Sequence, residues 1–391
     1  MTLADQPPAA ALVFQTLLAH GPLTRAETGR RTGLSPGAVT KVVTPLLADG
    51  WIIELDEPAP RRATGRPATL IAVRGERARF IGVKATADQL IGVVTDLTAR
   101  PLLTRRAALR SREVGTVVPA IARLVRRLRT AVDATALGGG SGGDGSIHSI
   151  GVTVAGDVDG SGGVVRYSPF LDWRQVPLAR LLREAVGTPV VVENDVRALT
   201  VAEQWFGAGA GLSSFALVTV GAGIGCGLSV GGRVVSGAYG VSGEIGHLPL
   251  GGGDRVCGCG NTGCVEAVAS TRAITEQARE ATGDPGLTMA EAVRLAHGGD
   301  PAVRAVFARA GEALGLAIAS VANLIGPERV IISGEGVASY DLFAEQVRTA
   351  FTAQAFGAAA ACDLLLRPLP FEAWARGGAA VAAERLFAPT R

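Results

Sequence analysis

The sequence has little net charge, few cysteines and almost no lysine. A formal charge of +3 is too small to make the whole chain a polyanion binder, so any nucleic-acid contact must come from a local basic patch. The five cysteines do not form a disulfide framework, because three lie within eight positions and Cys226 and Cys362 stand alone. We expect those two to be buried as small apolar residues. Lys41 and Lys84 are the only lysines, so arginine supplies nearly all of the positive charge.

The sequence also lacks targeting and membrane-spanning segments. Residues 1–8 have neither the basic start nor the apolar run of a signal peptide, and no later apolar run is long enough to cross a bilayer. We therefore expect a soluble, cytoplasmic protein with no membrane partner. At 391 residues, 48% of them hydrophobic, the chain is too long for one ordinary core and should divide into two or three domains.

The N-terminal segment predicts three short helices separated by tight turns. Apolar residues recur at helical spacing over residues 9–20, and the pair Gly21 and Pro22 ends that helix. Residues 24–27 have the form of a capping box, in which the threonine accepts from the glutamate amide while the glutamate side chain reaches back. Gly33 ends the second helix, and Ser35 then caps a third helix whose first residue is proline.

The third helix, expected over residues 36–49, carries the predicted DNA-reading face. Its outer face is small, polar and basic, which suits a major groove, because small side chains let the backbone approach and Thr or Lys can reach bases or phosphates. Pro45 removes the bond to the Lys41 carbonyl and should bend the helix. The predicted core residues are Val39, Val42, Val43, Leu46 and Leu47. The predicted DNA contacts here are Ser35, Gly37, Thr40, Lys41 and Thr44.

A basic hairpin follows this helix. Residues 51–55 and 68–73 predict its two strands, and arginines lie between them. A hairpin with a basic tip beside a helix-turn-helix is a winged helix, whose tip touches phosphates or the minor groove. The alternative is a solvated basic loop on a helical domain that does not bind DNA. The predicted contacts at the tip are Arg61, Arg62 and Arg66.

After residue 75 the pattern becomes that of an α/β protein. A glycine- and serine-rich run over 138–146 is interpreted as a surface loop inside a domain, because strands resume directly after it. The strand that ends at Asp195 finishes in polar groups, and ligands collect at such strand ends in open α/β sheets. The predicted strands are 80–85, 89–96, 147–154, 190–195, 215–220 and 329–332. The predicted helices are 117–132, a helix ending at Phe206, 305–325 and 377–383.

The densest chemistry lies in the segments 243–247 and 257–266. They hold three thiols and an imidazole at metal-ligand spacing, which is a closed tetrahedral set that zinc prefers. Because no coordination position stays open, the zinc would be structural. Nearby glycines permit the tight turns that a chelating loop needs, and the alternative is a cysteine-rich turn without metal. The predicted zinc ligands are His247, Cys257, Cys259 and Cys264.

With these segments in place, the chain resembles the ROK family (repressor, open reading frame, kinase) over essentially its whole length, and within it the regulator branch. The most specific match is 243–270, which contains the family's Gly-Glu-Ile-Gly-His and Cys-x-Cys-Gly-x-x-Gly-Cys-x-Glu elements. The resemblance implies an N-terminal winged helix-turn-helix followed by a two-lobed, actin-like ATPase (sugar-kinase-like) α/β body, assembled as homodimers or homotetramers. The implied domains are 1–75 for DNA binding, 76–195 with 373–391 for the small lobe, and 196–372 for the large lobe.

The resemblance also implies a sugar cleft. Carboxylates, an amide and an imidazole can satisfy the hydroxyls of glucose, xylose, aminosugars or their phosphates in a dry pocket. His247 could bind zinc with one ring nitrogen and a sugar hydroxyl with the other. Gly156 and Ser168 lie where the family's first sugar-contacting loops are expected, with a looser local match. The implied sugar contacts are Asn194, Asp195, Glu244, His247, Glu266, Gly156 and Ser168.

The phosphate-binding segments separate a regulator from a kinase. In the family's kinases Asp195 would be the general base, and the body opens with Asp-x-Gly-Gly-Thr-Lys. Here the corresponding stretch 83–88 has lost both glycines and the leading acid, and the second loop, 221–225, has Ala222 where the kinases commonly place Thr. We therefore expect no ATP binding, and Asp195 as a vestigial base with no catalytic role.

These features predict a sugar-responsive repressor that binds double-stranded operator DNA and a small sugar or sugar phosphate effector. Sugar binding would close the two lobes and change the spacing of a dimer's winged helices against two half-sites. One alternative is an ATP-dependent sugar kinase with an auxiliary DNA-binding domain. Another is a regulator without a small ligand that responds to a protein partner.

Overall fold

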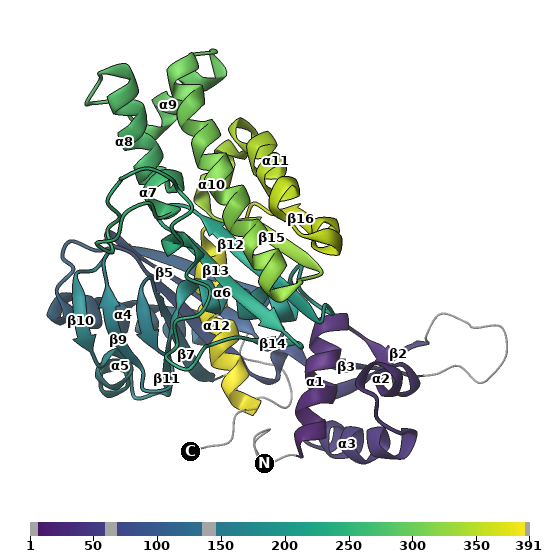
Figure 1. The fold of residues 1–391 in the computed structure, drawn as a ribbon. Helices are drawn as coiled ribbons and strands as arrows, with labels where there is room; N and C mark the ends of the chain where they lie inside the picture. Colours follow the sequence, from purple (N-terminus) through teal and green to yellow (C-terminus); the bar gives the residue numbers. More distant parts are fainter. Residues whose placement is uncertain (1–6, 59–68, 135–145, 388–391) are drawn as a thin grey trace. The chain divides into compact units, whose positions relative to one another are not determined.

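The computed structural model describes residues 7–58, 69–134 and 146–387 and divides into two compact units (Figure 1). Unit 1 runs to Gly211 and resumes at Glu372, and unit 2 spans Leu212–Phe371. The sequence suggested a lobe boundary at Asp195. That residue instead begins α6 (Asp195–Phe206), which packs inside unit 1 against the C-terminal helix α12 (Glu372–Glu384). Of the glycine- and serine-rich run, only Ser146 lies within the described residues.

Unit 1 opens with three helices and a small antiparallel sheet of order β1-β3-β2. The helices bury Val39 and Leu46, as expected, and also Phe14, whose ring packs edge-on against Trp51, while Leu47 is only partly buried. Strand β1 was not predicted, because two residues leave no pattern in a sequence. The elements are α1 (Pro8–His20), β1 (Leu23–Thr24), α2 (Arg25–Thr32), α3 (Pro36–Ala48), β2 (Ile52–Pro58) and β3 (Thr69–Val73).

The predicted helix caps are largely present. The Ser35 hydroxyl accepts from the Ala38 amide at 3.3 Å, and the Thr24 hydroxyl accepts from the Glu27 amide at 3.1 Å. The second arm of the predicted capping box is wrong. The Glu27 carboxylate turns along the helix to Arg31, with 2.8 Å between Oε1 and Nε, because an arginine four residues on is in reach.

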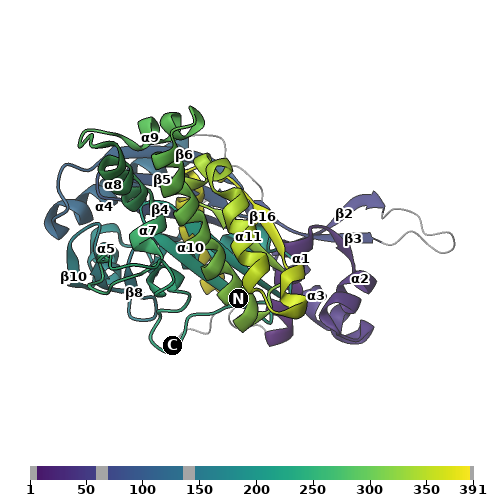
Figure 2. The ribbon, with the colours of Figure 1, turned by 45° about the horizontal axis from the view of Figure 1, so that its top comes forward.

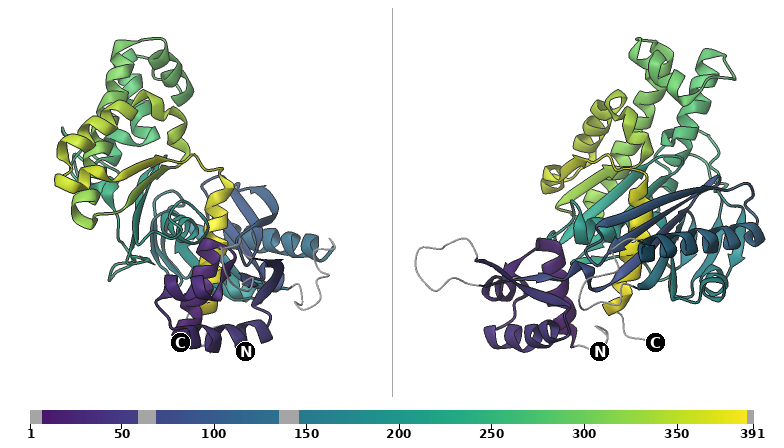
Figure 3. Two further views of the ribbon diagram at one scale, coloured as in Figure 1. Left: turned by 90° about the vertical axis from the view of Figure 1, so that its right-hand side faces the viewer. Right: turned by 180° about the vertical axis from the view of Figure 1, so that it is seen from behind.

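The body of unit 1 is a five-stranded sheet of order β11-β7-β4-β5-β6, covered on one face by α12 and on the other by α4 (Figure 3). A Cβ at Gly82 would lie 1.8 Å from the Ala375 carbonyl oxygen, so only glycine lets α12 approach this closely. The elements are β4 (Arg79–Ala85), β5 (Gln89–Asp96), β6 (Pro101–Ala108), α4 (Val114–Ala134), β7 (Ile147–Val154), α5 (Leu178–Val186), β11 (Val190–Asn194), α6 and α12. A smaller sheet holds β8 (Asp157–Asp159), β9 (Val164–Ser168) and β10 (Trp173–Val176).

Unit 2 is a second five-stranded sheet, of order β14-β13-β12-β15-β16, with α10 and α11 packed side by side (Figure 2). The segment after Val220, expected as a glycine loop, is a tight turn that leads directly into β13. The strands are β12 (Ser214–Val220), β13 (Ile224–Val230), β14 (Arg233–Val234), β15 (Arg329–Ser333) and β16 (Asp363–Leu366). The helices are α7 (Glu266–Ala269), α8 (Thr271–Thr282), α9 (Met289–His297), α10 (Pro301–Ile325) and α11 (Ala344–Gln354).

Helix α10 corrects one expectation from the sequence. At 25 residues it is long and apolar enough, by length and composition, to cross a membrane, whereas the sequence was interpreted as containing no such stretch. Of its most apolar window, 67% is already buried inside the structure. Phe307, Leu314 and Ile318 lie in the core of unit 2. The helix is therefore a core element of that unit.

Candidate functional sites

Unit 2 gathers the predicted metal ligands on one short loop. His247 ends a 3₁₀ turn, Ile245–His247, and the three cysteines lie on the loop that leads to α7. The Cys257 amide donates to the Asn261 carbonyl at 2.7 Å, which folds the loop back on itself. Gly260 and Gly263 have φ of 93° and 72°, a backbone conformation that favours glycine, so these positions permit the fold.

The four side chains fit a tetrahedral metal centre. All four ligand atoms lie within 4.8 Å of one another. Cys259 Sγ lies 3.8 Å from Cys264 Sγ, and Cys257 Sγ lies 3.6 Å from His247 Nδ1. Tetrahedral metal–sulfur bonds of ~2.3 Å and metal–nitrogen bonds of ~2.0–2.1 Å give edges of ~3.8 Å and ~3.6 Å. The cluster is therefore compatible with one bound metal ion, as the cysteine and histidine spacing predicted.

The thiols of this cluster differ in their readiness to ionise. Burial raises the pKa of Cys257 and Cys264. A backbone hydrogen bond from Asn261 lowers the pKa of Cys259. Because a metal binds the thiolate form, metal binding must release protons from the two buried cysteines.

The unit 2 candidates for sugar binding lie beside the metal cluster. His247 turns Nδ1 to Cys257 and leaves Nε2 4.0 Å from Glu244 Oε2, so its two ring nitrogens face different partners. Glu266 Oε2 accepts from the Ile224 amide at 2.9 Å. A Cβ at Gly246 would lie 2.3 Å from the Ile224 carbonyl oxygen, so the 3₁₀ turn packs directly on the start of β13. Strand β13 thus holds the Glu244 and Glu266 segments together.

The unit 1 candidates gather around the N-terminus of α6. The Asn194 side chain accepts from the Arg197 amide at 3.0 Å and donates to the Gly156 carbonyl at 2.9 Å. The Ser168 hydroxyl donates to the Ala155 carbonyl at 2.7 Å. The structure therefore brings Asn194, Gly156 and Ser168 together, and it uses much of their hydrogen-bonding capacity to hold the loop and cap the helix.

Asp195 lies buried at the first position of α6 and is paired with Lys84. Its Oδ1 accepts from the Val196 amide at 2.9 Å, and its Oδ2 accepts from Lys84 Nζ on β4. The Lys84 ammonium also lies 5.6 Å from the centre of the Trp374 ring. The sequence marked the stretch around Lys84 as a lost phosphate loop but did not identify this ion pair. A lone lysine inside an apolar strand was the available signal.

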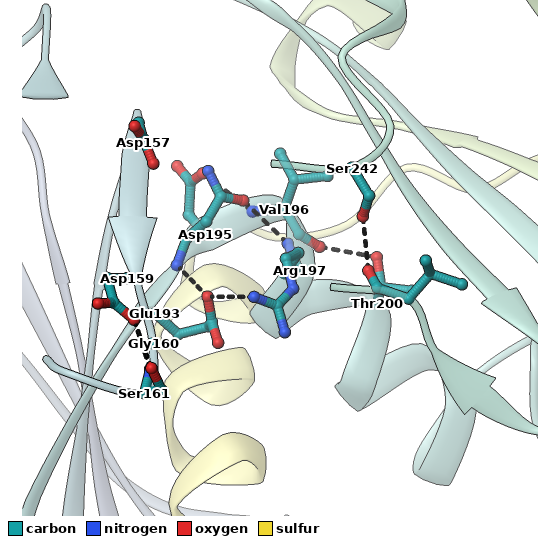
Figure 4. A network of polar contacts seen from close by, with 12 residues as sticks. Asp157, Asp159, Gly160, Ser161, Glu193, Asp195, Val196, Arg197, Thr200 and Ser242 are labelled. Atoms are coloured by element: carbon teal, nitrogen blue, oxygen red, sulfur yellow. Dashed lines mark hydrogen bonds and ion pairs between the residues drawn. The ribbon is translucent and has the colours of Figure 1, made fainter. Parts of the chain in front are cut away.

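Glu193 is hydrogen-bonded to the first turn of α6 (Figure 4). Its Oε1 accepts from the Asn194 amide at 2.8 Å and from Arg197 Nη1 at 3.1 Å. Burial raises the pKa of Glu193, and the Arg197 guanidinium opposes that shift. Asn194 and Asp195 therefore lie at the start of a helix whose first turn is stabilised by the ion pair between Glu193 and Arg197.

The outer face of α3 has the exposure expected of a DNA-reading helix. Gly37, Thr40, Lys41 and Thr44 are all exposed. The threonine hydroxyls, however, donate within the helix, Thr40 to the Pro36 carbonyl at 3.0 Å and Thr44 to the Thr40 carbonyl at 2.9 Å. Helix α3 continues through Pro45 to Ala48. The wing-tip candidates Arg61, Arg62 and Arg66 lie outside the described residues.

A pocket of about 630 Å³ lies within unit 1, between α1 and the C-terminal end of α6. Leu17 and Leu18 line it from α1, and Trp205 and Phe206 line it from α6. The Arg376 guanidinium of α12 lies 5.8 Å from the Phe206 ring centre. Helix α6 therefore carries Asp195 at one end and contacts α1 at the other.

Comparisons with known proteins agree with this architecture. A protein-family model described as ROK family matches residues 84–385. The N-acetylglucosamine repressor of Escherichia coli O6:H1 (strain CFT073) is 30% identical over 346 residues, covering 83% of this chain and 80% of the relative.

Two solved structures have similar folds. A ROK family transcriptional regulator, a homologue of the E. coli MLC protein, matches with a TM-score of 0.78 and 26% identity over 97% of this chain and 96% of its own. A ROK family glucokinase from Streptomyces griseus, solved with glucose and AMPPNP, matches with a TM-score of 0.64 and 28% identity. The glucokinase match covers 78% of this chain and 100% of the glucokinase.

Proposed function

Because the chain belongs to the ROK family, as its motifs predicted, we propose that it is a sugar-responsive transcriptional regulator, a repressor that binds operator DNA. Two observations support this function over sugar phosphorylation. The regulator match extends over 97% of the chain, N-terminal helices included, while the glucokinase match covers 78%. The second observation, which carries most of the argument, is the buried ion pair between Lys84 and Asp195.

The ion pair argues against kinase chemistry because of where the two charges lie. A general base must accept the proton of the attacking sugar hydroxyl. The Lys84 ammonium donates to Oδ2 of Asp195, and the helix amide of Val196 donates to Oδ1, so both oxygens already accept hydrogen bonds. Each carboxylate oxygen still has a second lone pair, so Asp195 is proposed as a vestigial base that is held in an ion pair and accepts a hydrogen bond from a sugar hydroxyl.

The proposed sugar contacts are the residues that the family resemblance implies. They are Asn194 and Asp195 in unit 1, and Glu244, His247 and Glu266 in unit 2. Gly156 and Ser168 support this set mainly through the Asn194 loop. Carboxylate and imidazole groups suit neutral sugars and sugar phosphates of several kinds.

A structural zinc ion is proposed for His247, Cys257, Cys259 and Cys264. Three thiolates and one imidazole form a closed set that leaves no open position for catalysis. The ion would fix the loop that carries His247 Nε2 and Glu266 toward the effector. Zinc here would supply folding energy rather than chemistry.

DNA contact is proposed through α3 and the wing arginines Arg61, Arg62 and Arg66. In a homodimer or homotetramer, two such helices would reach two half-sites of a double-stranded operator. Helix α6 supports a route from effector to DNA, since it begins at Asp195 and ends at residues that face α1. A protein that works in this way acts in the cytoplasm, beside the chromosome.

An electrophoretic mobility shift assay tests the proposal. The full chain is incubated with DNA from its own promoter, with and without glucose, xylose, N-acetylglucosamine, glucose 6-phosphate, xylose 5-phosphate and N-acetylglucosamine 6-phosphate. We expect a specific shift that one sugar changes. Absence of specific DNA binding under every condition would defeat the proposal.

The competing function is an ATP-dependent sugar kinase with an auxiliary DNA-binding domain. The retained Asp195 and the fold shared with the S. griseus glucokinase favour testing it. A coupled ADP-release assay across the same sugars should give no turnover. Robust turnover that Asp195→Asn abolishes would establish the kinase instead. Specific DNA binding without sugar binding in calorimetric titration would indicate a protein partner as the signal.

A further inference from the structure

The glycine turn between β12 and β13 is closed by the carboxylate of Glu335, which lies just after strand β15. The turn is tight, with the Gly221 amide donating to the Gly223 carbonyl at 3.0 Å. The Ala222 amide, at its tip, donates to Glu335 Oε1 at 2.9 Å. A Cβ at Gly221 would lie 2.2 Å from the same oxygen, so the carboxylate rests directly on the turn.

The backbone before Glu335 holds its side chain in this place. Glu335 follows β15, which pairs in parallel with β12, so the ends of the two strands are neighbours. Gly334 has φ of 101°, and a Cβ there would lie 2.3 Å from the Val220 carbonyl oxygen. Only glycine permits this approach, which brings residue 335 over the turn.

The contact joins an exposed negative charge to a backbone amide. Glu335 is exposed, and its carboxylate accepts a hydrogen bond from the Ala222 amide. Glycine-rich turns with outward amides bind phosphate oxygens because the amides point at the anion. An ionised carboxylate oxygen, like a phosphate oxygen, is an anionic hydrogen-bond acceptor.

We propose that Glu335 is an internal anion that occupies the phosphate position of the turn at residues 221–223. The turn is thereby closed to inorganic phosphate and to the phosphates of a nucleotide, and it becomes a phosphate site when this carboxylate is removed. The inference rests on contacts inside unit 2 and goes beyond the proposed regulator function. It stands whether or not the protein responds to a sugar.

Glu328 offers a matched control on the same strand pair. Its Oε1 accepts from the Ser213 amide at 2.7 Å and from the Ser214 amide at 3.2 Å, at the opposite end of β12. Glu328→Gln removes the same charge from a carboxylate that also caps backbone amides. If phosphate affinity rises in the Glu335 variants but not in Glu328→Gln, the gain therefore comes from the glycine turn and not from the change in net charge.

Isothermal titration of the full chain with inorganic phosphate and with magnesium ADP tests the proposal. Glu335→Ala should bind inorganic phosphate at least ~10-fold more tightly than the wild type, since a like charge in contact has been removed. Glu335→Gln should gain less, because its amide oxygen still accepts from Ala222. The Ala222 amide resonance should move during the titration of Glu335→Ala, and Glu328→Gln should behave as the wild type.

Three results would overturn the proposal. They are equal phosphate affinity in the wild type and Glu335→Ala, an equal gain in Glu328→Gln, and a gain without movement of the Ala222 resonance. If Glu335→Ala fails to fold, Glu335→Gln keeps the hydrogen bond and carries the test alone. Both variants should still show no sugar phosphorylation, because Lys84 remains on Asp195. If the wild type shows no specific DNA binding, the proposed regulator function is contradicted, but this inference about Glu335 is not affected.

Discussion

Lys84 and Asp195 form a buried ion pair that ties β4 to the first residue of α6. The side chains are 7% and 11% exposed, so solvent screens the pair little. In unit 2, the carboxylate of Glu335 lies on the turn at Gly221. In each unit, a charged side chain of the protein therefore lies against a group that a kinase of this family would use on its substrates. Lys84 lies against Asp195 in unit 1, and Glu335 lies against the turn at Gly221 in unit 2.

Removing Lys84 should destabilise unit 1 strongly. Lys84→Met leaves the Asp195 charge buried without its partner, and breaking a buried pair in this way costs about 3–5 kcal/mol. The double variant Lys84→Met with Asp195→Asn should recover most of that loss, because no unpaired charge remains. Urea unfolding followed by tryptophan fluorescence and by circular dichroism measures both.

The exposed pair of Arg180 and Glu184 provides the control for this experiment. Both side chains are 61% exposed, and Arg180→Met should change the free energy of unfolding by less than about 1 kcal/mol. A Lys84→Met variant as stable as Arg180→Met would show that the buried pair contributes nothing to unit 1.

The sequence predicted the strands with regular apolar patterns and missed those without them. Strands β4 and β5 were expected within a residue of their ends, because each is apolar on both faces. Strand β6 was missed, since Arg105 and Arg106 interrupt the apolar residues of an exposed edge strand. Strand β13 was missed because its glycines suggested a loop. Strand β6 depends on its position at the edge of the sheet and β13 on close packing of its backbone. Neither property can be recognised from the local sequence.

The candidate sites were likewise predicted where their residues are close together in the sequence and missed where they are far apart. The metal ligands lie within one short segment, so their spacing alone predicted the cluster that the structure contains. Lys84 and Asp195 are 111 positions apart, and Ala222 and Glu335 are 113 apart, so no local pattern joins them. The hydroxyls of Thr40 and Thr44 also escaped prediction, because a sequence does not tell whether a threonine bonds to its own helix.

Replacing a metal ligand should release zinc. Cys257→Ser or Cys259→Ser should reduce bound zinc from about one ion per chain to near none, and should lower both thermal stability and sugar response. Cys362→Ser is the control, since that thiol lies elsewhere in unit 2 beside β16. Elemental analysis by mass spectrometry gives the metal content. Unchanged zinc in Cys257→Ser would refute the ligand assignment.

Lys41→Ala should weaken DNA binding without affecting sugar binding. Lys41 is the exposed cation on α3, and loss of one phosphate contact should reduce the slope of log affinity against log salt by about 1. Arg309→Ala removes the same charge from an exposed position on α10 and should change neither quantity. Arg66→Ala is expected from the sequence to behave like Lys41→Ala. Fluorescence anisotropy at several salt concentrations measures the slope, and an equal effect of Arg309→Ala would contradict the assignment to α3.

Phe206→Ala should uncouple the effector from DNA. The ring lies at the C-terminal end of α6, where it lines the pocket shared with Leu17 and Leu18 of α1, and Asp195 lies at the other end of the same helix. Allosteric coupling of about 1–3 kcal/mol corresponds to a ~5–150-fold effect of sugar on DNA affinity, and most of this effect should disappear. Sugar affinity itself should change by less than about twofold, because the substitution is at the far end of α6 from Asp195.

The control for Phe206→Ala is Phe170→Ala, which removes another phenyl ring from a more exposed position in unit 1. Anisotropy with labelled operator, with and without saturating sugar, gives the coupling, and calorimetry gives sugar affinity. If the sugar effect on DNA binding survives in Phe206→Ala, the signal does not pass through this end of α6. If sugar affinity falls as far as the coupling does, the ring supports the sugar site and not its connection to α1.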